Sequence, residues 1–161
     1  MMDIAVQRFA VHKSITVEAP VAHVFRTFTA GHNDWWPRSH HIGKGEAFTA
    51  ILEPRAGGRC FERAPDGTEC DWGRVLVWEE PHRIVMTWDL DTDFRFDATL
   101  GTEVEVRFIA EAPGRTRVEL THRCLERYGD KAEFMRNLFD SPNAWTGGLE
   151  AMRDRAEQTA R

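Results

Sequence analysis

The sequence predicts an α+β fold of the helix-grip type, in which a curved antiparallel sheet of about seven strands wraps around a long C-terminal helix. Three observations support this prediction. Residues 9–19 alternate between apolar and polar, two short helical segments follow, and alternating stretches recur over residues 46–121. A single apolar stripe at helical spacing lies near the C-terminus. The 161 residues suit one domain, spanning 1–161.

The first strand and the two short helices occupy the N-terminal part of the chain. Residues 9–19 (FAVHKSITVEA) are rich in β-branched side chains, which favours a strand. Pro20 suits the first turn of a helix, where its missing N–H has no partner to lose. This helix would end before Gly31. Its apolar face would carry Val21, Val24, Phe25 and Phe28. A second short helix or turn would hold residues 33–36, stopped by Pro37.

The middle of the chain is expected to form a meander of antiparallel strands. The strands would cover residues 47–54, the two arms of a hairpin within 57–80, then 82–90, 102–111 and 115–124. In the last two strands the alternating inward positions are Val104, Val106, Phe108, Val118, Leu120 and His122. Mostly polar residues occupy the positions between them, as expected for a sheet with one solvated face.

The hairpin contains Asp66–Gly67, which favours a tight two-residue turn. That turn predicts a register. It would place Phe61, Arg63, Cys70 and Trp72 on the inner face and Cys60, Glu62, Glu69 and Asp71 on the outer face. A disulfide between Cys60 and Cys70 would then be disfavoured. An inward Arg63 could extend past the sheet edge or bind a ligand carboxylate. A bulge at Gly73 would change the facing of Arg74, so the facing of both arginines stays open.

The C-terminal part of the chain is predicted to be helical. Residues 129–140 form one candidate segment, and Ser141 followed by Pro142 resembles the start of a second helix, running to about Thr159. Its apolar stripe consists of Trp145, Leu149, Met152 and Ala156. Gly147–Gly148 inside this helix would allow close approach to the sheet or leave space for a ligand.

Composition and charge narrow the function classes. The net charge of −5 and the scattered Lys and Arg argue against a nucleic-acid partner. No apolar run reaches the length of a membrane span, and the N-terminal MMDIAVQRFA does not resemble a signal peptide. Three cysteines without CxxC spacing are expected to be reduced thiols. The expected location is the cytoplasm, without membrane insertion.

The segment GHNDWWPRSHHIG, residues 31–43, raises the question of a metal site. It contains His32, Asp34, His40 and His41, but their spacing does not make ligands converge. We therefore predict no metal and interpret the segment as a wall, with Trp35 and Trp36 covering a cavity mouth or filling the core. No nucleophile elbow, phosphate loop or dinucleotide motif occurs, so no cofactor is predicted.

Three stretches, WWPRSHHIG, residues 53–88 and the strands 102–111 and 115–123, resemble bacterial proteins of the heat-shock ATPase activator homologue type. These belong to the START-like (SRPBCC) superfamily, which includes polyketide cyclases and relatives of the birch-pollen allergen. The resemblance covers residues 9–157 and is most specific over 57–88. It implies the helix-grip fold and a cavity that holds apolar ligands, in which some members catalyse cyclisations or hydrolyses.

Three functions remain open at this stage. The favoured one is binding of a hydrophobic or amphipathic small molecule between the sheet and the C-terminal helix. The side chains expected to bind it are Trp35, Trp36, Phe61, Arg63, Trp72, Trp88, Val106, Phe108, Val118, Leu120, His122, Trp145, Leu149 and Met152. A second is an enzyme in the same cavity with His122 as base, although His122 could equally be a structural histidine bonded to its neighbours. A third is a chaperone-partner module acting through its surface.

Overall fold

The computed structural model describes residues 9–160, so most of the N-terminal stretch without signal-peptide character lies outside the described residues. No helix in the described part is long and apolar enough to cross a membrane. The elements are β1 (Val11–Val17), α2 (Val21–Phe28), α3 (His32–Trp35), β2 (Thr49–Leu52), β3 (Arg59–Arg63), β4 (Glu69–Glu79), β5 (Arg83–Trp88), β6 (Thr102–Ala112), β7 (Arg115–Arg123), η1 (Leu125–Lys131), α4 (Ala132–Asp140), η2 (Pro142–Thr146) and α5 (Gly147–Thr159).

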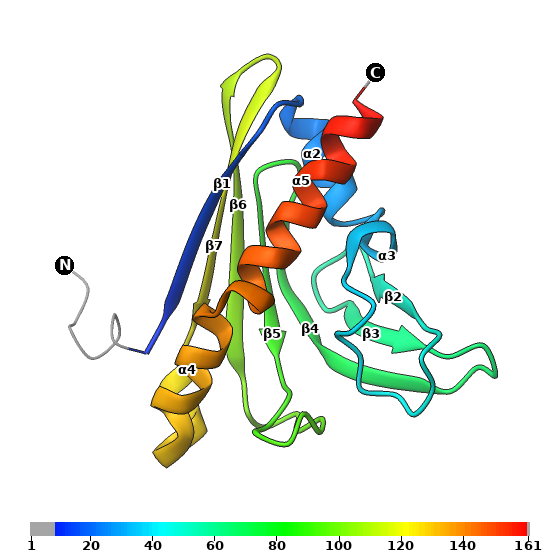
Figure 1. The fold of residues 1–161 in the computed structure, drawn as a ribbon, viewed down its shortest axis with the longest axis vertical. Coiled ribbons are helices and arrows are strands. Elements are labelled where there is room, and N and C mark those ends of the chain that lie inside the picture. Colours follow the sequence, from blue (N-terminus) through cyan, green and yellow to red (C-terminus); the bar gives the residue numbers. More distant parts are fainter. Residues whose placement is uncertain (1–8, 161) are drawn as a thin grey trace.

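The strands form one seven-stranded sheet in the order β1-β7-β6-β5-β4-β3-β2. All neighbouring strands are antiparallel. Figure 1 shows α5 crossing the sheet, with α2 beside its C-terminal end and α4 at the opposite end of the sheet. The α+β helix-grip fold predicted from the alternation pattern is therefore confirmed.

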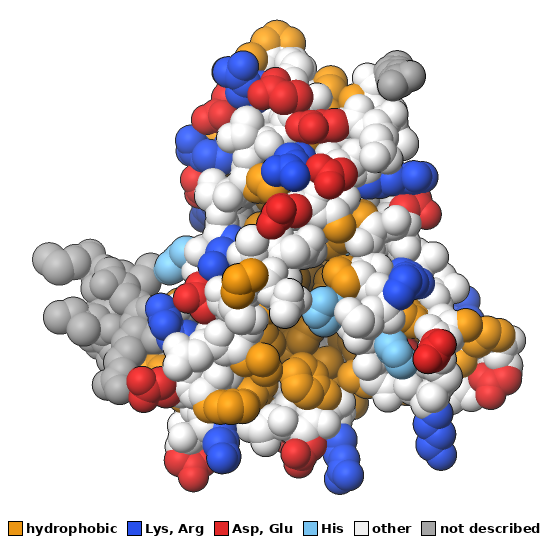
Figure 2. All heavy atoms as spheres, in the orientation of Figure 1, with side chains coloured by type: hydrophobic (Ala, Val, Ile, Leu, Met, Phe, Trp, Pro, Cys, Tyr) orange, Lys and Arg blue, Asp and Glu red, His pale blue; other side chains and the backbone are white. Residues whose placement is uncertain are grey.

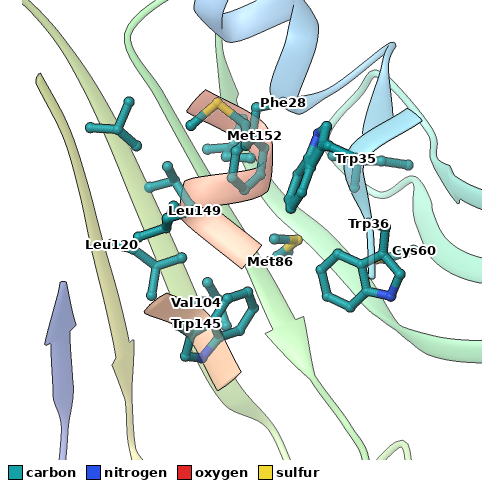
Figure 3. Close-up of a cluster of buried hydrophobic side chains, with 14 of the residues drawn as sticks. Phe28, Trp35, Trp36, Cys60, Met86, Val104, Leu120, Trp145, Leu149 and Met152 are labelled. Carbon is teal, nitrogen blue, oxygen red and sulfur yellow. The ribbon is translucent and has the colours of Figure 1, made fainter. Parts of the chain in front are cut away.

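The stripe on the C-terminal helix anchors the core. Leu149, Met152 and Ala156 are at most 3% exposed, as expected from their spacing. They share one buried cluster with the inward residues of β6 and β7. The rings of Phe25 on α2 and Phe108 on β6 meet edge to face at 5.0 Å. Figure 3 shows part of the buried cluster, with Leu149 and Met152 on α5 and Leu120 on β7. The apolar face of each element thus meets the others over one continuous core.

The predicted C-terminal helix begins at Pro142 but is not continuous. Residues 142–146 form a π-helical segment in which Ala144 has φ −98° and ψ −123°, well outside helical geometry. Regular α-helix starts only at Gly147. π-Helical segments often occur at functional sites. The break places Trp145 at the junction between α4 and α5.

The hairpin between β3 and β4 corrects the predicted register. Ala64 N–H donates to the Thr68 carbonyl and Gly67 N–H donates to the Ala64 carbonyl, so the turn comprises Ala64–Gly67. Gly67 has φ +92°, the left-handed conformation of a bulge glycine. A turn of this type with one extra residue replaces the predicted two-residue turn. Arg63 therefore pairs with Glu69 instead of Cys70.

The shift of one residue inverts the faces of β3, because side chains alternate along a strand. Cys60 and Glu62 are buried on the inner side at 5% and 3% exposure. Phe61 and Arg63 belong to the outer side. There Arg59 lies 3.9 Å above the Phe61 ring and Arg63 bonds Glu69. The predicted inward placement of Phe61 was wrong. The facing of the two arginines, which the sequence left open, is outward for Arg63, and Arg74 is exposed.

The predicted opposition of Cys60 and Cys70 was wrong for the same reason. Cys60 pairs across the ladder with Gly73, and Cys70 pairs with the inward Glu62. Both cysteines, and Cys124, are nevertheless free thiols. Burial raises the pKa of Cys60 to about 12, so this thiol stays protonated and unreactive.

Gly73 lies where the ladder between β3 and β4 is irregular, at the position where the sequence left a bulge open. The register shifts between Cys60 and Phe61, which leaves Trp72 as an additional residue on β4. A Cβ on Gly73 would sit 1.9 Å from the Thr87 carbonyl oxygen, far inside contact distance. Only glycine permits this approach of β4 to β5.

We expect Gly73→Ala to destabilise the protein by about 2 kcal/mol or more, because the backbone of β5 must move to admit the methyl group. Urea unfolding followed by far-UV circular dichroism would measure this loss. Gly45→Ala is the control, since no atom lies within 4 Å of a Cβ placed there. Equal stability of the two variants would contradict the close approach.

Candidate functional site

A pocket of about 420 Å³ opens at the end of the sheet near α4, within the size range of small-molecule sites. Figure 2 shows a hollow lined by hydrophobic side chains in the lower half of the molecule, with histidines beside it. The lining residues are Trp36, Pro37, Ser39, His40, His41, Ile42, Trp72, Trp88, Leu90, Phe94, Leu138, Phe139, Ser141, Asn143, Ala144, Trp145 and Gly148. Much of the segment 31–43 is therefore a wall, as the sequence indicated.

Four tryptophans dominate the lining. The ring centres of Trp36 and Trp72 lie 5.1 Å apart, and the two rings are tilted by 33°. Trp145 meets Trp36 edge to face at 6.2 Å and meets Trp88 at 5.6 Å. Together they form an aromatic surface contributed by the 36–42 loop, β4, β5 and η2. Such a surface favours flat aromatic or apolar molecules.

Three of these indoles are held by hydrogen bonds to the protein. Trp36 Nε1 donates to the His40 carbonyl at 2.7 Å, and Trp145 Nε1 donates to His122 Nδ1 at 3.1 Å. Trp72 Nε1 donates to Glu62 Oε1 at 3.0 Å. Because the N–H groups are engaged, the rings present mainly apolar surface to the pocket.

Glu62 is a buried carboxylate that connects the floor of the pocket to its wall. Besides Trp72, it accepts hydrogen bonds from the backbone N–H of Ile42 at 2.6 Å and of Gly43 at 3.1 Å. A Cβ on Gly43 would lie 2.9 Å from Glu62 Oε2, so the close approach favours glycine. Buried charges are normally compensated in this way. The predicted register placed Glu62 on the solvated face, so the sequence analysis did not identify it as a residue of the site.

His40 and His41 both lie at the pocket. Partial desolvation lowers the pKa of His40, and a hydrogen bond to the Asn143 backbone opposes that shift. His41 Nδ1 lies 3.1 Å from the Gly43 carbonyl, and its ring stacks on Phe48 at 5.2 Å. A carbonyl can only accept, so Nδ1 of His41 carries the proton of this bond. The sequence analysis considered these histidines only as metal ligands and did not name them as lining residues.

His122 lies behind the pocket instead of lining it. It is fully buried, as its inward position predicted. Nδ1 accepts from Trp145, which leaves Nε2 as the donor to Thr102 Oγ1 at 3.1 Å. Burial lowers the pKa of His122 to about 3, so the ring is neutral at pH 7. Both nitrogens are satisfied, which matches the structural alternative for His122. Its neighbours supply no second ionisable group in hydrogen-bond contact.

His32 is a second buried neutral histidine. Nδ1 donates to the Phe28 carbonyl at 3.2 Å, and Nε2 has no hydrogen-bond partner among the described residues. Desolvation lowers the pKa of His32 to about 4. Its ring lies 4.9 Å from that of Trp36, so it supports the pocket wall from inside the core.

The pocket brings together only part of the predicted set. Trp36, Trp72, Trp88 and Trp145 line it. Most of the other predicted residues belong to the packed core behind it: Trp35, Val106, Phe108, Val118, Leu120, Leu149 and Met152. Phe61 and Arg63 lie on the other face of β3. The pocket is thus at the end of the α5–sheet interface, next to the η2 break, and not along that interface.

Several lining residues were not predicted from the sequence. Leu90 and Phe94 follow β5 in a loop, and Leu138 and Phe139 end α4. Phe94 has φ +58° and is 41% exposed, an unusual combination for a large apolar side chain. Within residues 9–160, no three His, Cys, Asp or Glu side chains are grouped in a way that could hold a metal ion.

Comparisons with known proteins place this site in context. The family model described as Activator of Hsp90 ATPase homolog 1-like protein matches residues 18–146. The anthrahydroquino-gamma-pyrone synthase Txn09, solved in complex with a compound abbreviated SUM, is 41% identical with a TM-score of 0.63. That match covers 91% of this chain and 96% of Txn09. No curated protein matches the chain.

Two further solved structures share the fold. The self-sacrificing resistance protein CalC from Micromonospora echinospora is 29% identical with a TM-score of 0.70, covering 92% of this chain and 94% of CalC. Protein NE0264 from Nitrosomonas europaea is 14% identical with a TM-score of 0.66, covering 98% and 97% of the two chains. The family match spans most of the described chain. The protein therefore belongs to the Activator of Hsp90 ATPase homolog 1-like family, within the START-like superfamily that its sequence resembles.

Proposed function

We propose that this protein binds a fused-ring aromatic small molecule in the pocket between the 36–42 loop, the ends of β4 and β5, and η2. The observation that carries the proposal is the set of four tryptophans that line one hollow, three of them with their N–H groups engaged by the protein. A flat polycyclic ligand would bury its faces against these rings. Burial of apolar surface contributes about 25 cal/mol per Å², which gives affinity without directional bonds.

The similarity to Txn09 supports this class of ligand. Txn09 is described as the synthase of an anthrahydroquino-gamma-pyrone, a product with fused aromatic rings, and it is 41% identical to this chain. The pocket volume of about 420 Å³ accommodates a three-ring molecule. We also propose that the protein meets this ligand in the cytoplasm, which is the location expected from the sequence.

The chaperone-partner alternative finds less support. The exposed large hydrophobic residues of the described chain are Leu76, Phe94, Phe96, Phe134 and Leu138. Phe94 and Leu138 belong to the pocket lining, so a small molecule already accounts for their exposure. The family name alone does not transfer a chaperone partner to this chain.

Binding is testable with 2-methoxyanthraquinone as the probe. We expect it to quench tryptophan fluorescence and to shift the indole N–H signals of the pocket in two-dimensional NMR. Asn143→Trp should weaken the affinity at least fivefold, because Asn143 is an exposed lining residue and a large ring there would narrow the pocket.

Asn137→Trp is the matched control. Asn137 is also exposed, lies on α4 and does not line the pocket. Its replacement should leave the affinity unchanged. A parent protein that does not bind the probe, or equal effects of the two replacements, would contradict the proposed function.

The structural role of His122 has a pH signature. Its folded pKa of about 3 lies below the ordinary value of 6.5, so between these values the unfolded chain binds a proton that the folded protein excludes. The stability from neutral His122 is therefore present above pH 6.5 and is lost progressively as the pH falls towards 3.

We expect His122→Gln to be less stable than the parent at pH 7, and to lose less stability than the parent between pH 6.5 and 4. Chemical unfolding at a series of pH values would measure both. His32, whose pKa is also lowered, is present in both proteins. Its contribution to the pH dependence of stability is therefore the same in both and cancels from the difference. Parallel stability curves for the two proteins would show that His122 is not buried in its neutral form.

A further inference from the structure

The ring of His41, one of the two histidines that line the pocket, is held by a hydrogen bond and a stacking contact. Nδ1–H donates to the Gly43 carbonyl, so the neutral ring carries its lone pair on Nε2. Among residues 9–160, no hydrogen bond reaches Nε2. One ring face stacks on Phe48, with an interplanar angle of 28°. Phe48 is itself covered on a face by Arg38, whose Cζ lies 4.2 Å from the ring centre.

Glu62 fixes the short segment to which His41 is bonded. Its carboxylate holds the N–H groups of Ile42 and Gly43, and the Gly43 carbonyl in turn holds the His41 ring. Glu62 is 3% exposed, so it is shielded from competing water. The carboxylate thus orients His41 through the backbone without touching the imidazole. This arrangement restricts rotation of the His41 side chain and therefore limits the directions in which Nε2 can point.

From this geometry we propose that His41 Nε2 accepts a hydrogen bond from an aromatic hydroxyl group of the bound ligand and takes its proton. The inference rests on the proposed function and specifies the ligand as a hydroxylated aromatic. In this step the ligand O–H bond breaks, its electron pair stays on oxygen, and an N–H bond forms on Nε2. The products are a phenolate and an imidazolium. Glu62 is a positioning residue.

The position of His41 at the pocket favours such a step. An ion pair deep among the tryptophans would lose most of its solvation, which raises the cost of forming charges. His41 is half-buried, so the imidazolium would keep part of its hydration. The aromatic body of the ligand can at the same time lie on the indoles. The pocket therefore combines an apolar floor with a lining imidazole whose ring is held by Gly43 and Phe48.

The test compares 2-hydroxyanthraquinone with 2-methoxyanthraquinone, which has the same ring system and carries a methyl group in place of the hydroxyl proton. Ionisation of the hydroxyl group changes the visible absorbance of the hydroxyl probe. The methoxy probe has no proton to lose there and cannot show this change. We expect the parent protein to bind the hydroxyl probe at least tenfold more tightly, a preference in the range of one buried hydrogen bond. The bound probe should also ionise at a pH about one unit or more below that of the free probe.

Two replacements of His41 separate accepting a hydrogen bond from taking a proton. His41→Asn retains an amide donor near the Nδ1 position but removes the acceptor at Nε2, so the hydroxyl preference and the absorbance shift should both disappear. His41→Gln places an amide oxygen near Nε2 and should restore part of the preference without the shift, since an amide cannot take the proton. In each variant the affinity for the methoxy probe serves as the reference, so the readout is the ratio of the affinities for the two probes.

Glu62→Gln should reduce the absorbance shift per molecule of bound hydroxyl probe, since the amide cannot accept all three hydrogen bonds and His41 is then less well oriented. His82→Asn is the control, because His82 is exposed and does not line the pocket. An unchanged absorbance shift in His41→Asn would overturn this inference but not the proposed function. Loss of the shift in His40→Asn but not in His41→Asn would do the same. Failure of the parent to bind either probe would overturn the proposed function and the inference with it.

Discussion

The left-handed conformation of Gly67 determines which face of β3 meets the core, and the pocket depends on that choice. A four-residue turn with Gly67 as its bulge residue pairs Arg63 with Glu69. A two-residue turn would shift the ladder by one and exchange the faces. Glu62 would then point to solvent, and Trp72 would lose its partner. The N–H groups of the 42–43 segment would lose theirs as well.

The register also explains how a charge is tolerated beside an apolar pocket. Glu62 accepts three hydrogen bonds, two of them from backbone N–H groups whose positions are fixed by the chain. Hydrogen bonds to a charged group contribute about 1.5–3 kcal/mol each, enough together to offset much of the desolvation of the carboxylate. On the opposite face, the charges of Arg59, Glu69 and Asp71 form exposed ion pairs. Those pairs contribute little, because water screens them.

The fold could be predicted because it follows from local periodicity, whereas the pocket could not be located the same way. The alternation of Val104, Val106 and Phe108 and the stripe of Leu149 and Met152 identified core faces correctly. These residues pack against one another, so their inward positions did not imply a cavity. The break at Ala144 moves the opening to the end of the sheet, and no spacing rule reveals it. Only the tryptophans, as large aromatics, carried a signal for the lining.

The hairpin register could have been predicted from the sequence, but the proposed role of His41 could not. Pro65 precedes Asp66–Gly67, and proline favours the second position of a type I turn, with glycine at the fourth. That pattern favours the observed turn over the two-residue alternative. His41, by contrast, is oriented through Glu62, twenty-one residues later in the chain. Its environment depends on tertiary packing, which composition and local spacing do not encode.

The proposed site has an apolar floor, formed by the rings of the four tryptophans, and polar side chains near its opening. This arrangement limits how the pocket could discriminate among ligands. The polar groups behind the indoles are already committed: Glu62 to Trp72, His122 to Trp145 and the His40 carbonyl to Trp36. Stacking on the rings is non-directional and depends mainly on the area that is buried. Two ligands of the same outline would therefore gain similar free energy from the floor. A preference between them then comes from the polar groups of the lining: Trp88 Nε1, which has no hydrogen-bond partner among the described residues, and the side chains near the opening. A freely rotating side chain at the opening would discriminate poorly. The two interactions that fix the His41 ring, with Gly43 and Phe48, supply the directionality that the floor lacks.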